Sequence, residues 1–137
     1  MKQRKQKPAA EALPAKQQRA LESALQRRAA DAESIVEFVD RTSLAGDEEE
    51  VAGELTTTDQ HPADTADVAF QRELDLTVRE MAEAREARAE EALQRLQDGT
   101  YGICTECGKR IELARLEALP DATTCIDCAR RKEHVPR

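Results

Sequence analysis

The chain has 137 residues, enough for one small domain with extensions. Only 2% of the residues are aromatic and there is no Trp, so a broad globular core is hard to assemble, whereas the many Ala, Glu, Arg, Leu and Gln residues are typical of long helices. A net charge of -7 argues against general affinity for DNA, because that affinity depends on Lys and Arg neutralising phosphates.

Hydropathy and cysteine spacing bear on where the protein works. The N-terminus has no apolar run typical of a signal peptide, and no stretch is long enough to cross a bilayer. The cysteines are spaced for metal binding, which fits a reducing compartment. We therefore expect a cytoplasmic protein with no membrane partner.

Residues 1–13 predict a disordered basic tail. This segment carries Lys2, Arg4, Lys5 and Lys7 and lacks hydrophobic periodicity. Such a tail could touch nucleic acid or an acidic protein, but a solvated tail is the commoner structure.

The next segment predicts a helix from about Pro14 to about Arg41. Proline fits the first turn of a helix, where its missing N–H does no harm. Apolar residues then recur at spacings of three, four or seven, with Arg28 at the one polar position; they are Leu21, Leu25, Ala32, Ile35 and Val39. This pattern indicates one side of a coiled coil.

An acidic connection follows, and we expect it to form the tip of a helical hairpin at about 44–66. No Lys or Arg occurs between Leu44 and Asp67, while Glu48, Glu49 and Glu50 follow one another. Gly46, Gly53 and Pro62 interrupt any regular helix here. An acidic run of this kind is most often a solvated surface.

A second helix is predicted from Thr65 to Gln97, with Asp64 as its N-cap and Asp98-Gly99 as its end. Its apolar stripe consists of Phe70, Leu74, Val78, Met81, Ala89, Ala92 and Leu96. Such a helix is about 50 Å long and could pair antiparallel with the first. The predicted fold is therefore mainly α, with a two-helix coiled-coil hairpin over residues 14–98.

The remaining residues, 99–137, predict a small zinc-finger module that ends in a short helix near Ala129–Glu133. All four cysteines of the chain lie here as two CxxC pairs, Cys104 with Cys107 and Cys125 with Cys128. Two residues between thiolates let one tight turn aim both sulfurs at a tetrahedral Zn²⁺. Iron and a redox pair are the alternatives, but no βαβ pattern accompanies the CxxC.

We therefore expect one structural Zn²⁺ per chain. Four protein ligands leave no open position on the metal, so the site would hold the fold and perform no chemistry. Its apparent binding free energy, on the order of 10 kcal/mol, would decide whether this part folds.

Basic residues surround the two cysteine pairs, namely Lys109, Arg110, Arg115, Arg130, Arg131 and Lys132. Four thiolates on Zn²⁺ leave a net charge of about -2, which nearby cations would balance. A nucleic-acid surface is the alternative explanation for the same residues.

The finger resembles the zinc finger of the TraR/DksA family of bacterial transcription regulators. The matching run begins at Gly99-Thr-Tyr101-Gly102 and continues through Cys107-Gly108, Ile111, Arg115-Leu116, Ala118, Pro120 and Ala122 to Cys128. The resemblance extends more loosely to about residues 15–134. It implies a long two-helix coiled coil on a small zinc module that binds RNA polymerase and inserts its tip through the secondary channel.

The resemblance also implies which residues form the tip contact with RNA polymerase. The family's tip motif has the form Asp-x-x-Asp-x-Ala, and here the matching run is His61-Pro62-Ala63-Asp64-Thr65-Ala66. Asp64 and Ala66 match, while His61 replaces the first acid and makes the run similar to Gram-positive members. The alarmone ppGpp is a further partner implied by DksA.

Three functions of different classes follow. The first is a non-enzymatic transcription regulator that binds RNA polymerase and modulates initiation. The others are a zinc-finger nucleic-acid-binding protein and a zinc-stapled helical scaffold for another complex. Enzyme activity is not expected, because no nucleophile triad or phosphate loop is present.

Overall fold

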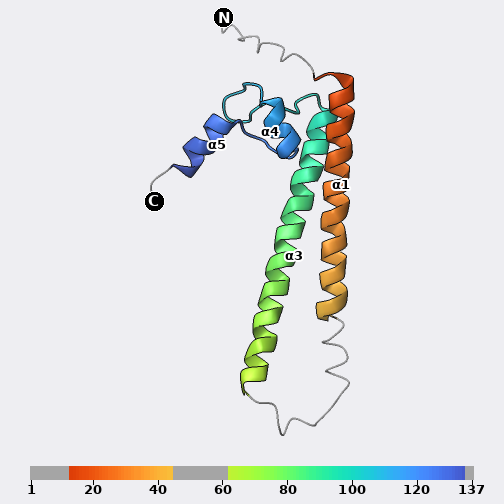
Figure 1. The fold of residues 1–137 in the computed structure, drawn as a ribbon, viewed down its shortest axis with the longest axis vertical. Helices are drawn as coiled ribbons and strands as arrows, with labels where there is room; N and C mark the ends of the chain where they lie inside the picture. Colours follow the sequence, from red (N-terminus) through yellow and green to blue (C-terminus); the bar gives the residue numbers. More distant parts are fainter. Residues whose placement is uncertain (1–12, 45–61, 135–137) are drawn as a thin grey trace, which may run out of the picture. The chain divides into compact units, whose positions relative to one another are not determined.

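The computed structural model describes residues 13–44 and 62–134. Helix α1 (Ala15–Val39) continues into the π-helical turn η1 (Asp40–Leu44), and α3 (Pro62–Gln97) follows. Two short helices, α4 (Leu113–Ala118) and α5 (Ile126–Glu133), complete the described part (Figure 1). These ranges contain no strand, only an isolated antiparallel bridge between Ile103 and Arg110. The predicted fold class is confirmed: a long antiparallel helix pair and a small four-cysteine module.

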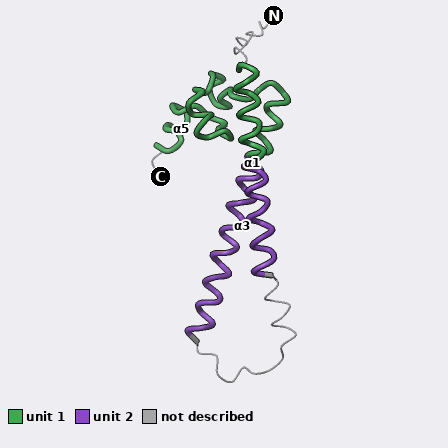
Figure 2. The backbone as a smooth tube through the Cα atoms, turned by 45° about the vertical axis from the view of Figure 1, so that its right-hand side comes forward, with its two compact units in different colours: residues 1–26, 89–137 green, residues 27–88 purple. Residues whose placement is uncertain are grey.

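The chain divides into two compact units (Figure 2). The first combines residues 1–26 with residues 89–137, and the second consists of residues 27–88. Each unit therefore contains part of α1 and part of α3. The sequence predicts divisions of the chain after residues 13 and 98. Those boundaries separate consecutive segments of the chain and not compact units, so they stay a prediction. None of the described helices has the length and apolar composition needed to span a bilayer.

Helix α1 buries the apolar stripe that its sequence predicts. In the first unit Leu21 and Leu25 are buried, and Leu25 is fully so. In the second unit Ala32 and Val39 are buried, while Ile35 is half-buried. Residues three and four apart lie on one side of a helix, so this stripe forms the contact side of α1 along its length.

Helix α3 behaves as predicted within the first unit. Ala89 and Ala92 are buried there, and their small side chains allow close packing. The helix ends at Gln97, and Gly99 follows with a φ of 72°, a left-handed conformation that glycine adopts without strain. The Thr100 N–H donates to the Arg95 carbonyl at 2.9 Å and closes the last turn.

Within the second unit the predicted stripe of α3 is wrong. Phe70, Leu74, Val78 and Met81 are all exposed, with Met81 64% exposed. The buried residue of this stretch is Ala82 instead. The contact with α1 therefore uses a neighbouring side of α3, whose larger residues are polar.

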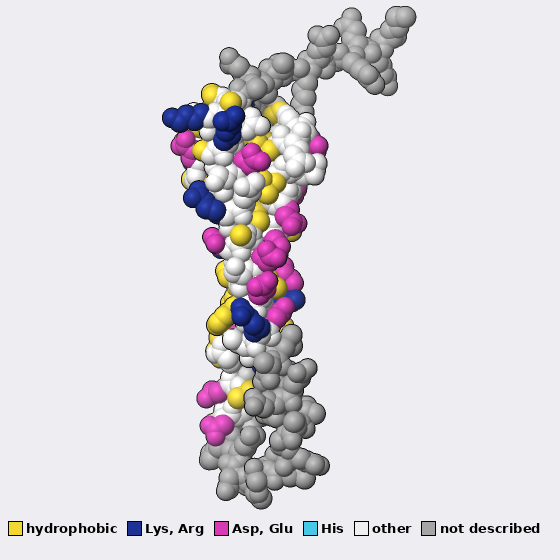
Figure 3. Space-filling model, turned by 90° about the vertical axis from the view of Figure 1, so that its right-hand side faces the viewer, with side chains coloured by type: hydrophobic (Ala, Val, Ile, Leu, Met, Phe, Trp, Pro, Cys, Tyr) yellow, Lys and Arg dark blue, Asp and Glu magenta, His cyan; other side chains and the backbone are white. Residues whose placement is uncertain are grey.

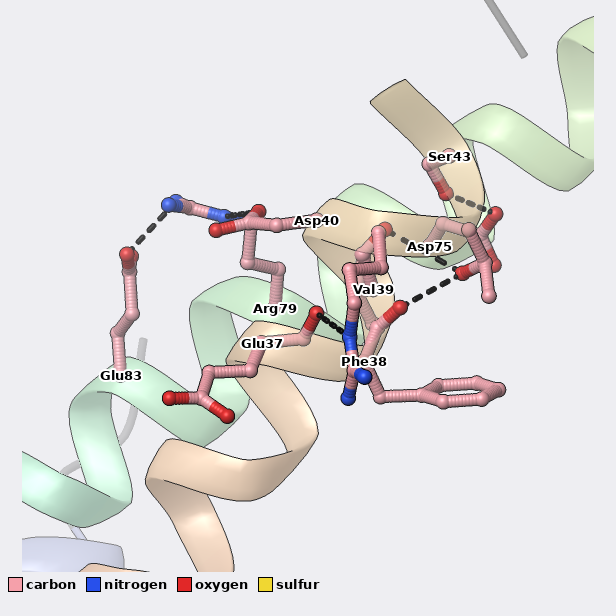
Figure 4. Close-up of polar contacts among 10 residues, drawn as sticks. Glu37, Phe38, Val39, Asp40, Ser43, Asp75, Arg79 and Glu83 are labelled. Atoms are coloured by element: carbon pink, nitrogen blue, oxygen red, sulfur yellow. Dashed lines mark hydrogen bonds and ion pairs between the residues drawn. The ribbon is translucent and has the colours of Figure 1, made fainter. Parts of the chain in front are cut away.

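Two side-chain contacts join that polar side to η1, which continues α1 (Figure 4). The Arg79 Nε donates to the Asp40 Oδ1 at 2.7 Å, and the Ser43 hydroxyl donates to the Asp75 Oδ2 at 2.7 Å. Arg79 also pairs with Glu83 one turn further along α3, at 2.6 Å. The hydrogen bond to Asp40 and the charges of both carboxylates raise the pKa of Arg79 further above its usual value.

The start of α3 also differs from its prediction. The helix begins at Pro62, so Asp64 lies inside its first turn and is not the N-cap. Proline is favoured at the first helical position, and this was the missed signal. A carboxylate in the first turn still interacts favourably with the positive end of the helix. Most of the predicted acidic tip, residues 45–61 including His61, lies outside the described residues.

The two short helices refine the prediction for the finger. Helix α5 begins at Ile126, earlier than the predicted Ala129, and so includes Cys128. Helix α4 was not predicted at all. It is held by Leu116, which is 1% exposed and among the most buried large side chains of the described part.

Candidate metal centre

The first cysteine pair lies in a tight turn closed by backbone hydrogen bonds. The Cys104 N–H donates to the Lys109 carbonyl at 2.8 Å, and the Gly108 N–H donates to the Cys104 carbonyl at 3.0 Å. Gly108 has a φ of 70°, the left-handed conformation that its position predicts. The turn therefore places Cys104 and Cys107 side by side.

The second cysteine pair lies at the start of α5. Cys125 directly precedes the first helical residue, with an extended backbone at φ -70° and ψ 166°, and Cys128 lies in the first turn. The N-terminal end of a helix carries partial positive charge and unpaired N–H groups, which favour thiolates over thiols. Both cysteines thus lie at this end of α5.

The four sulfur atoms converge on one point. Their Sγ atoms all lie within 4.8 Å of one another, all four cysteines are free of disulfides, and the Sγ atoms of Cys107 and Cys125 are 3.8 Å apart. Zn–S bonds of about 2.3 Å in tetrahedral geometry place sulfurs roughly 3.8 Å apart. The donor set and its spacing therefore fit one tetrahedral Zn²⁺.

Backbone and side-chain contacts hold the two pairs together. The Thr105 N–H donates to the Thr123 carbonyl at 3.0 Å, next to the first pair and shortly before the second. The Arg115 Nε of α4 donates to the Thr124 carbonyl at 3.0 Å. The segments that carry the sulfurs are thus joined by contacts that do not depend on a metal.

The surroundings of the two buried thiols differ. Burial opposes ionisation of Cys104, but backbone N–H groups of Cys107, Cys125 and Glu106 outweigh it and lower its pKa to about 6. Burial raises the pKa of Cys128 to about 12, and the neighbouring cysteines add to that effect. The backbone of the first turn is therefore arranged to stabilise a thiolate at Cys104.

Several of the predicted cations have partners within the finger. The Arg131 Nη2 donates to the Cys128 Sγ at 3.3 Å, and the Lys132 Nζ pairs with the Glu106 Oε1 at 2.8 Å. These contacts bring positive charge toward a cluster that carries about -2 when four thiolates bind Zn²⁺. They agree with the electrostatic explanation of the basic residues.

A small buried core supports the metal centre from the side of α3. The Tyr101 hydroxyl donates to the Pro120 carbonyl at 2.7 Å, and both residues are buried. The Arg95 Nη2 of α3 donates to the Ile103 carbonyl at 2.6 Å, directly before Cys104. The sequence shows which residue types occur here, but it gives no indication that Tyr101 pairs with Pro120 or Arg95 with Ile103.

A family model matches this part of the chain. Residues 99–134 match the prokaryotic dksA/traR C4-type zinc finger, and the match includes all four cysteines. The finger is therefore of the DksA/TraR type. The family match and the sulfur geometry agree on one structural Zn²⁺.

Named relatives in the DksA/TraR family cover different shares of the chain. The YteA protein of Bacillus subtilis is 45% identical over 76 residues, which are 55% of this chain and 31% of YteA. The RNA polymerase-binding transcription factor DksA of Caulobacter vibrioides is 37% identical over 91 residues, 64% of each protein. The chain thus spans less than two thirds of the length of these relatives.

A solved structure of the family is similar over more of the chain. The transcription factor DksA2 of Pseudomonas aeruginosa has 29% sequence identity and a TM-score of 0.66, and the likeness covers 87% of this chain and 84% of DksA2. The likeness therefore includes helical parts as well as the finger.

The residues that the DksA/TraR resemblance assigns to the tip lie apart in sequence from the finger. Asp64 and Ala66 are exposed on the first turns of α3, in the second unit, whereas the four cysteines belong to the first. His61 lies outside the described residues. The role of all three as a polymerase contact stays a prediction.

Proposed function

We propose that this chain is a non-enzymatic transcription regulator that binds RNA polymerase. The observation that carries the proposal is the joint likeness of finger and helices to DksA2, a transcription factor, over 87% of the chain. Caulobacter DksA, whose name states RNA polymerase binding, supports the choice of partner. The net charge of -7 fits a protein partner better than DNA.

In this proposal Cys104, Cys107, Cys125 and Cys128 are the four ligands of the structural Zn²⁺. A bound Zn²⁺ supplies a cross-link between the two cysteine pairs and leaves no open coordination position. Other groups of the chain stabilise the sulfurs: backbone N–H groups stabilise the Cys104 thiolate, and Arg131 donates to the Cys128 sulfur. The finger is thus a structural support.

The end of the helix pair near Asp64 is proposed to enter the secondary channel of the polymerase. Asp64 and Asp67 are exposed carboxylates at the beginning of α3. Carboxylate oxygens are ligands for Mg²⁺, so acids delivered near a Mg²⁺-dependent centre can perturb the ion or the elements around it. Initiation would be modulated in this way, with ppGpp as a further ligand of the assembled complex.

Direct nucleic-acid binding is a weaker candidate. Three of the six cations around the finger already contact acceptors within it, namely Arg115, Arg131 and Lys132. On the face drawn in Figure 3, basic side chains are interspersed with acidic ones. Phosphate binding favours a continuous basic surface.

The experiment uses zinc-loaded chain and purified bacterial RNA polymerase core. Asp64→Asn should keep polymerase binding within about twofold and lose most of the effect on transcript yield in a reconstituted reaction, since an amide keeps the size but removes the charge. Glu73→Gln, an acid further along α3, is the matched control and should keep both. An Asp64→Asn variant with full effect would remove the tip from the mechanism, and absence of polymerase binding by the unmodified chain would end the proposal.

A further inference from the structure

Helix α3 carries an exposed apolar stripe in the second unit. It consists of Phe70, Leu74, Val78 and Met81, whose spacings of four, four and three residues keep them on one side of the helix. Phe70 is 62% exposed, and the least exposed of the four, Leu74, is 42% exposed. Four large apolar side chains in a row form a contiguous apolar patch, and such patches are often functional.

The stripe lies on the side of the helix pair that faces away from the Asp40–Arg79 ion pair. Met81 is two residues from Arg79 and Phe38 is two residues from Asp40, so each lies about 160° around its helix from the paired residue. Figure 4 shows the Phe38 ring pointing away from Asp40 and Arg79. Phe38, 61% exposed, therefore adds an aromatic ring to the same side.

The two ends of the stripe carry opposite charges. Asp67 precedes it and Arg85 follows it, and the two are about five full turns apart, so they lie on the same side of α3 as the stripe. Both are exposed, and neither has an ion-pair partner among the described residues. An acid at one end and a base at the other make the stripe complementary to a reversed copy of itself.

We propose that this stripe binds the same stripe of a second copy of the chain, antiparallel and about a two-fold axis that passes midway between Leu74 and Val78. In this register Leu74 of one copy meets Val78 of the other, and Asp67 of one meets Arg85 of the other at both ends. A two-fold interface requires a patch that is complementary to itself, and the charges at the ends of this stripe meet that requirement.

The size of the stripe sets the strength of the pairing. From Asp67 to Arg85 it runs about 27 Å, and a helix about 10 Å wide then offers roughly 300 Å² per copy. Stable interfaces bury about 800 Å² per partner, so the dimer is weak, with a Kd on the order of 100 µM. Because salt screens the attraction between Asp67 and Arg85, we expect the dimer to be weaker at high salt.

The test is sedimentation equilibrium of the full zinc-loaded chain at low salt, from about 10 µM to about 1 mM, which brackets that Kd. Asp67→Arg alone and Arg85→Asp alone each place like charges together at both ends and should weaken the dimer about tenfold. The double variant exchanges the charges and should restore the unmodified Kd within about twofold. Glu80→Arg, an exposed acid about 120° around α3 from the stripe, is the control and should leave the Kd unchanged.

Leu74→Asp provides a second, independent variant. A charge at the centre of the apolar stripe should weaken the dimer by more than about 30-fold. Circular dichroism checks that every variant keeps its helix content. A chain that stays monomeric throughout overturns the proposal, and so does a dimer that the charge exchanges leave unchanged. A monomer whose binding to RNA polymerase falls with Leu74→Asp would assign the stripe to that other partner and also overturn it.

Discussion

The pKa of Tyr101 can be measured without any added probe, because Tyr101 is the only Tyr in a chain that has no Trp. Burial raises the pKa of its hydroxyl to about 12, the charge of Asp121 adds to the effect, and the charge of Arg95 opposes it. The neutral hydroxyl also donates to the buried Pro120 carbonyl at 2.7 Å, a bond that ionisation would destroy. We therefore expect the folded protein to resist formation of tyrosinate.

The sign and the size of the effect on stability follow from linkage. The folded pKa lies above the unfolded value of about 10, so this contribution is complete below pH 10 and is lost as the pH rises from 10 to about 12. A difference of this size would be worth up to about 2.7 kcal/mol, and we expect about 1 to 2 kcal/mol because solvent reaches part of the ring.

The assay follows tyrosinate absorbance near 295 nm during an alkaline titration of the zinc-loaded chain. The midpoint should lie near pH 12 in the folded protein and near pH 10 in denaturant. Tyr101→Phe should show no absorbance change, which identifies the signal, and should cost about 1 to 2 kcal/mol because it leaves the Pro120 carbonyl without its donor. A folded protein that titrates near pH 10 would refute the buried hydrogen bond.

Two further predictions concern the helix pair and the metal centre. Leu25→Ala should cost about 2 to 4 kcal/mol in chemical denaturation, because Leu25 is fully buried, whereas Phe38→Ala at an exposed site should change stability by less than about 0.5 kcal/mol; equal losses would contradict the assigned contact side of α1. Cys107→Ser should abolish stoichiometric zinc by metal analysis, since Cys107 is exposed and the change removes a ligand without opening a core cavity. A variant that kept one zinc per chain would exclude Cys107 as a ligand.

The metal centre could be predicted from the sequence because its determinants are local. Two residues between cysteines suffice to place two sulfurs side by side, and Gly108 supplies the left-handed turn that its position indicates. The structure adds that the two cysteine pairs converge. The contacts that support the pairs, such as the hydrogen bond from the Tyr101 hydroxyl to the Pro120 carbonyl, could not be predicted because the partners are far apart in sequence.

The two long helices were predictable to different degrees. The stripe of α1 was identified correctly, since apolar spacing decides which side is buried at Leu21 and Leu25. The same method failed for the part of α3 that precedes Ala89, where polar contacts with η1, the Asp40–Arg79 ion pair and the Ser43–Asp75 hydrogen bond, join the helices on another side of α3. A count of apolar residues on one helix does not consider polar partners on another.

Helix α4 was missed for a different physical reason. Six residues are too few to show helical periodicity and too few to be stable as an isolated helix. Leu113, Ala114 and Leu116 are good helix formers, and this composition was the available signal. The helix exists because Leu116 is buried and Arg115 donates to the Thr124 carbonyl.

The most direct test of the central claim is recovery of partners by the tagged, zinc-loaded chain from a bacterial lysate, with nuclease treatment and identification by mass spectrometry. We predict stoichiometric recovery of RNA polymerase subunits that persists after nuclease treatment. Recovery of nucleic acid alone, or of an unrelated complex in place of the polymerase, would contradict the claim and leave the family likeness as evidence of fold only.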